Sequence, residues 1–393
     1  MKKYRRRTQL IHGGTKRSSF GETSEAIYLS SGYVYDSAEQ GAARFRGDEE
    51  GFIYSRYANP SVRMFEERMT LLEGAEDARA TATGMAAVTA SLLCQLQQGD
   101  HVVSAKALFG SCRFVIEDIL PRYGIECTLV NGTDLEAWQK ATRKNTKLFF
   151  LESPSNPLLE ILDIKAISEI AHKAGAQLLV DNVFATPWLQ KPLALGADIS
   201  IYSATKHIDG QGRCLGGIIL GTSEFVEETL ANYLRQTGPA LSPFNAWILL
   251  KGLETLELRV NAQCDNAEHL VKFLSKQKQV KQVIYPGLKT HPQYKLAQKQ
   301  MDRNGSLLSF ELEGGEQRAF AFCNALRLIL ISNNLGDSRT LITHPTTTTH
   351  HRLGEEERLE LGITGGILRI SAGLEDAQDL TEDIASALEQ AYV

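Results

Sequence analysis

The short stretch Ser203-Ala204-Thr205-Lys206 combines two hydroxyl groups with an amine directly after an apolar segment, residues 199–202. The apolar segment predicts a strand, so the amine is expected at a strand end. A lysine whose pKa is lowered by burial can bind an aldehyde covalently and later act as a base, while hydroxyl groups bind a phosphate. These are the groups that pyridoxal phosphate requires, and the sequence therefore predicts Lys206 as its anchor. By itself the tetrapeptide also fits an exposed lysine that follows a strand.

Two further segments could hold the same cofactor. Asp181 follows the apolar residues 178–180, where a carboxylate could keep a pyridine nitrogen protonated. It could equally open a turn before Pro187. Gly84 and Met85 lie at an expected helix start, where free N–H groups bind phosphate, although small residues there also form an ordinary helix cap.

Arginines supply the remaining candidates for binding anions. Tyr54 and Arg56 lie two residues apart before a turn, so that both side chains could reach one phosphate. Arg369 stands between apolar residues in an expected strand. It is either part of a buried ion pair or the receptor of a substrate α-carboxylate.

The histidines and cysteines do not form a metal-binding pattern. His344, His350 and His351 flank a Pro/Thr loop with no carboxylate or cysteine at a suitable spacing, so a loop that lines the active site is expected and no metal is predicted. The 6 cysteines are scattered without a CxxC pair, which is typical of a reducing compartment such as the cytoplasm.

A parallel sheet covered by helices is expected to position these groups, because strand-like and helix-like segments alternate along the chain. Strands are expected at 101–105, 126–130, 147–151, 177–180, 199–202 and 215–220, with helices at 86–97, 111–122, 135–142 and 164–174. Ligands bind at the carboxyl ends of such strands, where Glu152, Asp181 and Lys206 fall. Beyond residue 240, an apolar stripe from Leu253 to Leu274 predicts a long helix. Strands at 283–285, 307–312, 328–331 and 368–371 and helices at 316–325 and 376–391 are expected after it.

The fold class predicted is therefore α/β, in three parts. Residues 1–60 are an extended arm, 61–254 an α/β domain that binds the cofactor, and 255–393 a smaller α+β domain. The chain has 393 residues, is 43% hydrophobic and carries a net charge of −5. Such a balance gives no reason to expect nucleic acid or membrane partners.

Several motifs in order resemble the Cys/Met-metabolism family of pyridoxal-phosphate enzymes. They are His12-Gly13-Gly14, Tyr54-Ser55-Arg56, Thr83-Gly84-Met85-Ala86-Ala87, Glu152-Ser153-Pro154-Ser155-Asn156-Pro157, Asp181-Asn182-Val183-Phe184-Ala185-Thr186-Pro187, Ser203-Ala204-Thr205-Lys206 and Arg369-Ile370-Ser371-Ala372-Gly373. The resemblance implies the aspartate-aminotransferase-like fold (fold type I), with a mostly parallel seven-stranded central sheet. It also implies an arm that reaches a neighbouring subunit, and a homotetramer built from catalytic dimers.

The resemblance assigns roles to matched residues. Lys206 would be the Schiff-base lysine and Asp181 the partner of the pyridine nitrogen. Arg369 would hold the substrate α-carboxylate. The other expected cofactor contacts are Ser203, Thr205, Gly84 and Met85 at the phosphate, Tyr54 and Arg56 at the phosphate of the neighbouring subunit, Asn156 at the ring oxygen, and Phe109 stacked on the ring.

Two departures from the family pattern favour its sulfhydrylase branch, which uses O-succinylhomoserine and sulfide. Phe109 replaces a stacking tyrosine, and Asn334 replaces a serine near the substrate. Arg113 is the first candidate for the acyl carboxylate, with Arg44 and Arg46 behind it; a solvated surface position remains the alternative. Cystathionine γ-synthase, O-acetylhomoserine sulfhydrylase and methionine or cystathionine γ-lyase activities use the same scaffold. A non-catalytic pyridoxal-phosphate-binding protein is the remote alternative.

Overall fold

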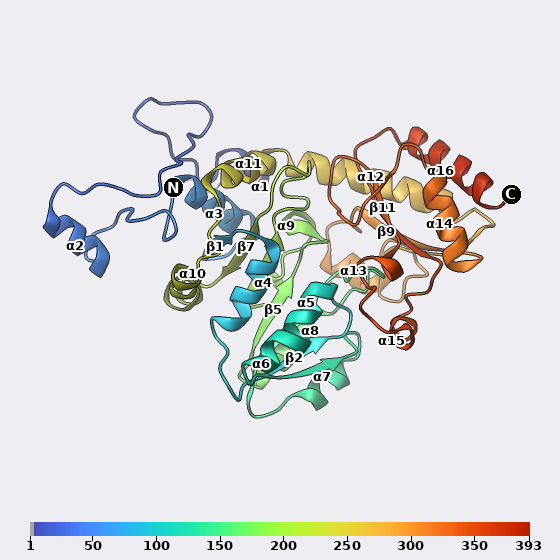
Figure 1. Cartoon of the computed structure of the whole chain (residues 1–393), viewed down its shortest axis with the longest axis horizontal. Coiled ribbons are helices and arrows are strands. Elements are labelled where there is room, and N and C mark those ends of the chain that lie inside the picture. The colour runs from blue at the N-terminus through green and yellow to red at the C-terminus, as the bar shows by residue number, and fades with distance from the viewer. Residues whose placement is uncertain (1–3) are drawn as a thin grey trace.

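The structure is a computed structural model that describes residues 4–393 (Figure 1). The described residues form two β-sheets, of which the larger positions the candidate site. Its seven strands lie in the order β1-β7-β6-β5-β4-β2-β3. They are β1 (Asp77–Thr81), β2 (His101–Ala105), β3 (Glu126–Val130), β4 (Thr146–Glu152), β5 (Gln177–Asp181), β6 (Ile199–Ser203) and β7 (Gly217–Gly221). Strands β3, β2, β4, β5 and β6 pair in parallel, whereas β7 runs antiparallel to both β6 and β1. The mostly parallel seven-stranded sheet expected from the sequence is thus present.

Helices cover both faces of this sheet because both faces of its strands are apolar. Ile218 and Leu220 of β7 pack into one core cluster, whereas Ile219 between them packs into another on the opposite face. The elements of this part are α3 (Pro60–Glu73), α4 (Gly84–Leu93), α5 (Gly110–Phe114), the π-helix Val115–Ile119, α6 (Leu120–Arg122), α7 (Leu135–Ala141), α8 (Ile164–Lys173), α9 (Thr186–Leu189), the 3-10 turn Leu193–Leu195, the π-helix Phe225–Leu230, α10 (Ala231–Thr237) and α11 (Pro243–Glu254).

A second sheet forms towards the C-terminus, with the strand order β10-β11-β12-β9-β8. Helix α12 (Leu256–Leu274) joins the two sheets: its Val260 packs in a core cluster of the first sheet, and its Leu270 packs in that of the second. The other elements are β8 (Val280–Ile284), α13 (Tyr294–Gln300), β9 (Leu307–Leu312), α14 (Gly315–Ala325), β10 (Leu330–Ile331), β11 (Leu341–Thr343), the 3-10 turn Pro345–Thr347, α15 (Glu355–Glu360), β12 (Ile367–Ser371) and α16 (Ala377–Ala391). The predicted stripe thus forms one long helix from Leu256 onwards, whereas its first residue, Leu253, belongs to α11.

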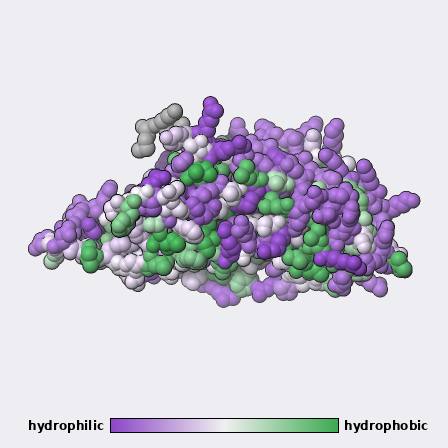
Figure 2. Space-filling view, turned by 90° about the horizontal axis from the view of Figure 1, so that it is seen from above, coloured by the Kyte–Doolittle hydropathy of each residue, from purple (hydrophilic) through white to green (hydrophobic). Residues whose placement is uncertain are grey.

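The N-terminal segment extends away from the body of the protein (Figure 1). Its first three residues lie outside the described residues. Two helices occur where an extended arm is expected: α1 (Arg6–His12), whose Leu10 joins a core cluster, and α2 (Ala38–Arg46) near the far end of the segment. Phe20 and Val34 in this segment are each 93% exposed. Figure 2 shows hydrophobic patches along the face seen from above, and large exposed apolar side chains of this kind are typical of surfaces that contact another chain.

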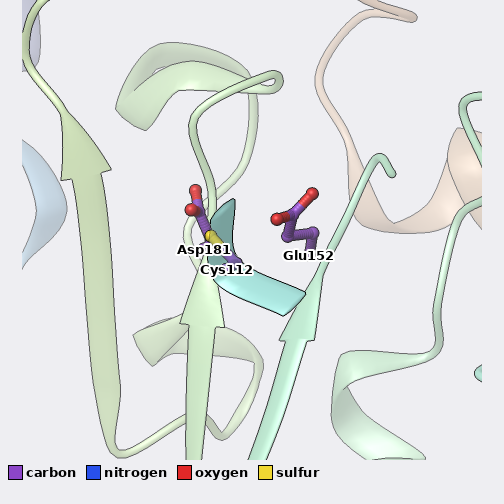
Figure 3. A group of neighbouring side chains, drawn as sticks. All are labelled: Cys112, Glu152 and Asp181. Carbon is purple, nitrogen blue, oxygen red and sulfur yellow. The ribbon is translucent and has the colours of Figure 1, made fainter. Parts of the chain in front are cut away.

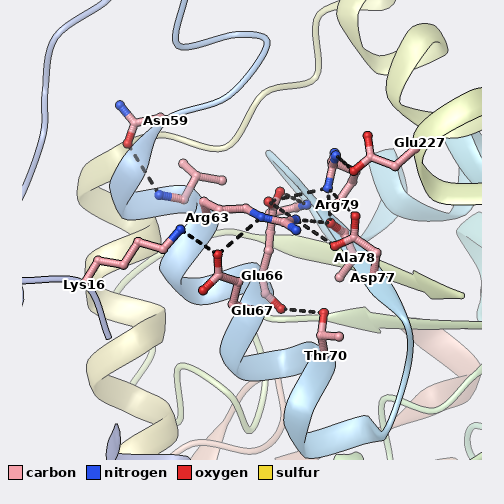
Figure 4. A network of polar contacts seen from close by, with 12 residues as sticks. Lys16, Asn59, Arg63, Glu66, Glu67, Thr70, Asp77, Ala78, Arg79 and Glu227 are labelled. Atoms are coloured by element: carbon pink, nitrogen blue, oxygen red, sulfur yellow. Dashed lines mark hydrogen bonds and ion pairs between the residues drawn. The ribbon is translucent and has the colours of Figure 1, made fainter. Parts of the chain in front are cut away.

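A network of charged side chains fixes α3 against the edge strand β1 (Figure 4). Arg63 contacts Asp77 at 2.7 Å, and Arg79 contacts Asp77 at 3.1 Å and Glu227 at 2.6 Å. The buried Glu66 accepts the Ala80 N–H at 2.8 Å, and burial raises its pKa despite the two nearby arginines. Because β1 is short and carries polar residues, this network and its pairing with β7 hold it in the sheet.

Candidate active site

The carboxyl ends of β4, β5 and β6 bring the predicted polar residues to one edge of the sheet. Glu152 and Asp181 are register neighbours, and Ser203 ends the next strand. A cavity of about 250 Å³ lies above this edge. Its walls include nine residues predicted from the sequence: Gly84, Met85, Phe109, Asn156, Asp181, Ser203, Thr205, Lys206 and Arg369.

Lys206 lies in this cavity with its amine held by one neutral partner. Its Nζ donates a hydrogen bond to Asn334 Oδ1 at 2.5 Å. Burial, together with the positive charge of Arg369, lowers the pKa of Lys206 to about 8. A larger fraction of this amine than of an ordinary lysine is therefore uncharged near neutral pH, and the uncharged form is the one that can attack an aldehyde or accept a proton.

An anion-binding cradle lies beside Lys206 at the start of α4. Thr83 caps this helix by accepting the Ala86 N–H at 3.0 Å, so that the first N–H groups of the helix remain free for an anion. A Cβ at position 84 would lie 2.5 Å from the Cβ of Ser203, so glycine is required for this close approach. Thr205 Oγ1 accepts the Gly216 N–H at 3.1 Å. The cradle suits a phosphate group.

Asp181 and Glu152 form a pair of neighbouring carboxyl groups in the floor of the cavity (Figure 3). Asp181 Oδ1 accepts the Val183 N–H at 3.1 Å, and Glu152 Oε1 accepts the Phe109 N–H at 2.7 Å. Together with Cys112 from α5, their ligand atoms lie within 4.8 Å of one another. Burial raises the pKa of both carboxyl groups. The sequence placed both Glu152 and Asp181 at strand ends expected to face a ligand and gave a specific role to Asp181; the contact with Cys112 depends on packing and has no sequence signal.

Arg369 is buried in the cavity wall, with only 1% of its surface exposed. Its Nη1 donates to Asn156 Oδ1 at 2.8 Å, and its Nη2 donates to the carbonyls of Asn333 and Asn334 at 3.1 and 3.2 Å. Its Nε has no partner, and no carboxylate of residues 4–393 forms an ion pair with it. Of the two interpretations that the sequence left open, the receptor for an anionic group fits this environment better.

A second cavity of about 940 Å³ adjoins the first, because Phe109, Asn333 and Thr349 line both. Arg113 lies in its wall, 6% exposed, with Glu117 at 2.7 Å and Glu357 of α15 as ion-pair partners. Its Nη1 is buried without a partner. The histidine loop lines the same cavity, and His344 contacts the carbonyl of Gly365 at 2.8 Å.

Four predicted arginine and tyrosine residues lie away from Lys206 of the same chain. The guanidinium of Arg56 lies 5.4 Å from the ring of Tyr54 and lines a different cavity. Arg44 pairs with Glu49 at 3.3 Å, and Arg46 pairs with Asp48 at 2.7 Å. A role for Tyr54 or Arg56 at the cofactor therefore requires a second subunit.

Together, a buried amine with a lowered pKa, a helix start whose N–H groups can bind phosphate and an acid facing the same cavity match the three parts of pyridoxal phosphate: aldehyde, phosphate and ring nitrogen. The structure thus defines a pyridoxal-phosphate-dependent enzyme of fold type I. Residues 7–389 match the family model described as "Cys/Met metabolism PLP-dependent enzyme", and the chain belongs to this family.

Relatives of known name agree with this assignment. The chain is 51% identical over 382 residues to an O-succinylhomoserine sulfhydrylase of Mycobacterium tuberculosis, covering 96% of this chain and 94% of the relative. A protein of the same name from Pseudomonas aeruginosa is 48% identical, covering 97% and 94%. A solved structure from Campylobacter jejuni, which contains N'-pyridoxyl-lysine-5'-monophosphate, superposes with a TM-score of 0.94 at 33% identity and covers 98% of this chain and 100% of that one.

Proposed function

We propose that the enzyme catalyses γ-replacement on O-succinyl-L-homoserine with sulfide, which yields L-homocysteine and succinate and serves methionine biosynthesis. The observation that carries the proposal is the unpartnered, buried Nη1 of Arg113 in the cavity next to the Lys206 site. Nη1 has almost no exposed surface and the other guanidinium nitrogens pair with Glu117 and Glu357, so a succinyl carboxylate would reach Arg113 by displacing one of these glutamates; an acetyl group has no charge to offer. The sulfhydrylase relatives from two organisms support the same assignment.

The proposed chemistry assigns one task to each side chain. When bound, pyridoxal phosphate supplies an electron-withdrawing ring that makes protons next to the amino-acid nitrogen acidic. Arg369 would bind the α-carboxylate, and Lys206 would take the Cα proton, since its pKa of about 8 suits a base at neutral pH. After a proton also leaves Cβ, the Cγ–O bond breaks and succinate departs. Sulfide then forms the new Cγ–S bond, and the two protons return to carbon.

Phe109 favours replacement over elimination. It lines both cavities and is positioned by its N–H bond to Glu152, so its ring can stack where the cofactor ring is expected. It carries no phenol that could assist proton transfer in a lyase. Cystathionine γ-synthase, O-acetylhomoserine sulfhydrylase and γ-lyase activities are the alternatives that the experiment below separates.

Assembly and location form part of the proposal. The arm, residues 1–60, would contribute Tyr54 and Arg56 to a neighbouring subunit, with 61–254 and 255–393 as the two domains of a protomer. The exposed Phe20 and Val34 support a contact of this arm with another subunit, and the proposed assembly is a homotetramer of catalytic dimers. All six cysteines are free, which fits the cytoplasm. In the described part of the chain, no helix has both the length and the apolar character needed to cross a bilayer.

Product analysis tests the function. Purified enzyme is supplied with O-succinylhomoserine together with sulfide, cysteine or no thiol, and then with the acetyl ester. Homocysteine and succinate in equal amounts, formed fastest from the succinyl ester and sulfide, are expected. Cystathionine as the preferred product, 2-oxobutyrate without a thiol, or a preference for the acetyl ester would each support one of the alternatives.

A further inference from the structure

The two carboxyl groups in the floor of the cavity, Glu152 and Asp181, lie so close together that the charge of one affects the protonation of the other. Glu152 ends β4 and Asp181 ends β5, in register on neighbouring parallel strands, so both side chains emerge on the same side of the sheet (Figure 3). Their oxygens and the Cys112 sulfur lie within 4.8 Å of one another. Two negative charges at this separation in a buried site repel each other strongly.

No cation compensates a second charge at this position among residues 4–393. Lys206 and Arg369 line the same cavity, but in the described chain neither forms an ion pair with Glu152 or Asp181, and their hydrogen bonds go to Asn334, Asn156 and backbone carbonyls. Cys112, on α5, has a thiol pKa raised well above its ordinary value by burial and by both carboxylates, so it remains a neutral group. The pair is therefore more stable with one proton bound and one negative charge than with both carboxyl groups ionised.

The surroundings decide which group keeps that proton. Asp181 faces the cavity and is the group expected to meet a protonated ring nitrogen, which would stabilise its negative charge. Glu152 is only 6% exposed, and no ion-pair partner lies near it in the described chain. Burial, which is the largest influence, and the charge of Asp181 both raise the Glu152 pKa, and together they outweigh the hydrogen bonds from the Phe109 N–H and the Cys112 thiol, which lower it. The proton thus belongs on Glu152.

We propose that Glu152 is a neutral carboxylic acid in the working enzyme and a positioning residue that links Phe109 to Asp181. Its Oε1 accepts the Phe109 N–H at 2.7 Å, which fixes the residue expected to stack on the cofactor. Its neutrality leaves a single negative charge on Asp181, so that only one anion faces the ring nitrogen. The inference rests on the pyridoxal-phosphate site and is independent of which acyl ester is the substrate.

Infrared spectroscopy of the holoenzyme in D₂O tests the protonation state directly. Wild-type enzyme should show the C=O stretch of a buried protonated carboxyl group at neutral pH, and Glu152→Gln should lose it. Glu160→Gln is the matched control: Glu160 is a partly buried carboxyl group outside the pair, and this variant should keep the band assigned to Glu152. Buried Glu66 and Glu73 also have raised pKa values, but their bands are common to both proteins and cancel in the difference spectrum of wild type minus Glu152→Gln. A difference spectrum without a protonated-carboxyl band would overturn the proposal.

Cofactor binding provides a second readout. Glutamine offers the same carbonyl acceptor and no charge, so Glu152→Gln should bind pyridoxal phosphate within about twofold of wild type and keep its visible absorption maximum. Glu152→Ala, which lacks the acceptor, should bind at least tenfold more weakly. Equal losses in both variants would mean that an ionised Glu152 is needed.

Metal analysis separates the proposal from the main alternative. Two carboxylates and a thiol could instead bind a divalent cation. Holoenzyme purified without chelator and incubated with Zn²⁺ or Mn²⁺ should retain no stoichiometric metal after desalting. One metal per chain that is lost in Glu152→Gln would contradict a protonated Glu152.

Discussion

Replacing Lys206 with methionine in the cofactor-free protein should change the pH dependence of stability by an amount that the structure allows to be calculated. The folded state lowers the pKa of this amine from 10.5 to about 8. Between these values the unfolded chain binds a proton that the folded chain does not, so the free energy of unfolding rises with pH across that window. At about 1.4 kcal/mol per pKa unit, the charged amine costs the fold about 3 kcal/mol at pH 7 and less than about 1 kcal/mol at pH 10.

Methionine has a similar length and no charge, so it removes this cost at every pH. It also removes the bond to Asn334 Oδ1, a loss of about 1 kcal/mol that hardly depends on pH. Relative to wild type, Lys206→Met should therefore be more stable by about 2 kcal/mol at pH 7, and this advantage should disappear by pH 10.

Urea unfolding at a series of pH values and one protein concentration measures the difference. Lys140→Met is the control, because the Lys140 side chain is 73% exposed and should track wild type. If the wild-type and Lys206→Met curves run parallel from pH 7 to pH 10, the amine is not desolvated in the fold and the reasoning about its reactivity fails.

Three further substitutions test other parts of the structure. Arg113→Ala should raise KM for O-succinylhomoserine by about ten- to a hundredfold, because a buried charged hydrogen bond contributes about 1.5–3 kcal/mol, and should leave the acetyl ester nearly unaffected; equal losses on both esters would assign Arg113 to the fold. Arg56→Ala should weaken cofactor retention. Mixing Arg56→Ala subunits with Lys206→Ala subunits should restore activity in verified hybrid oligomers, and no recovery would count against a site shared between subunits. Tyr202→Phe should lower the free energy of unfolding by about 1–3 kcal/mol in urea titrations without changing KM, because the Tyr202 hydroxyl donates to the buried Glu73 at 2.5 Å; an unchanged midpoint would contradict this.

The sequence predicted the sheet best where strands are buried and apolar. The buried strands β2 and β9 begin and end at the predicted residues, because their apolar residues lie between clear turn signals; β3, which is mostly half-buried, also has the predicted bounds. Strand β1, Asp77–Thr81, was missed since it carries polar residues, and its strand conformation depends on pairing with β7. Strand β11 was missed because it has only three residues.

The sequence predicted which residues line the site better than it predicted which side chains they contact. Parallel strands end at one edge, so Asp181 and Lys206 were expected to converge there, and both line the cavity. The contact of Arg113 with Glu357 spans 244 residues and has no local signal, and neither has the bond from Lys206 to Asn334. Such partners follow from the packing of the C-terminal sheet against the first.

The central claim is that the cavity above the sheet is organised around Lys206 as the residue that binds pyridoxal phosphate covalently. Borohydride reduction of the holoenzyme, followed by peptide mapping, tests it most directly. The pyridoxyl label should be found on Lys206 alone, and Lys206→Ala should have neither visible colour nor turnover. A label on any other lysine, or a coloured and active Lys206→Ala variant, would contradict the claim.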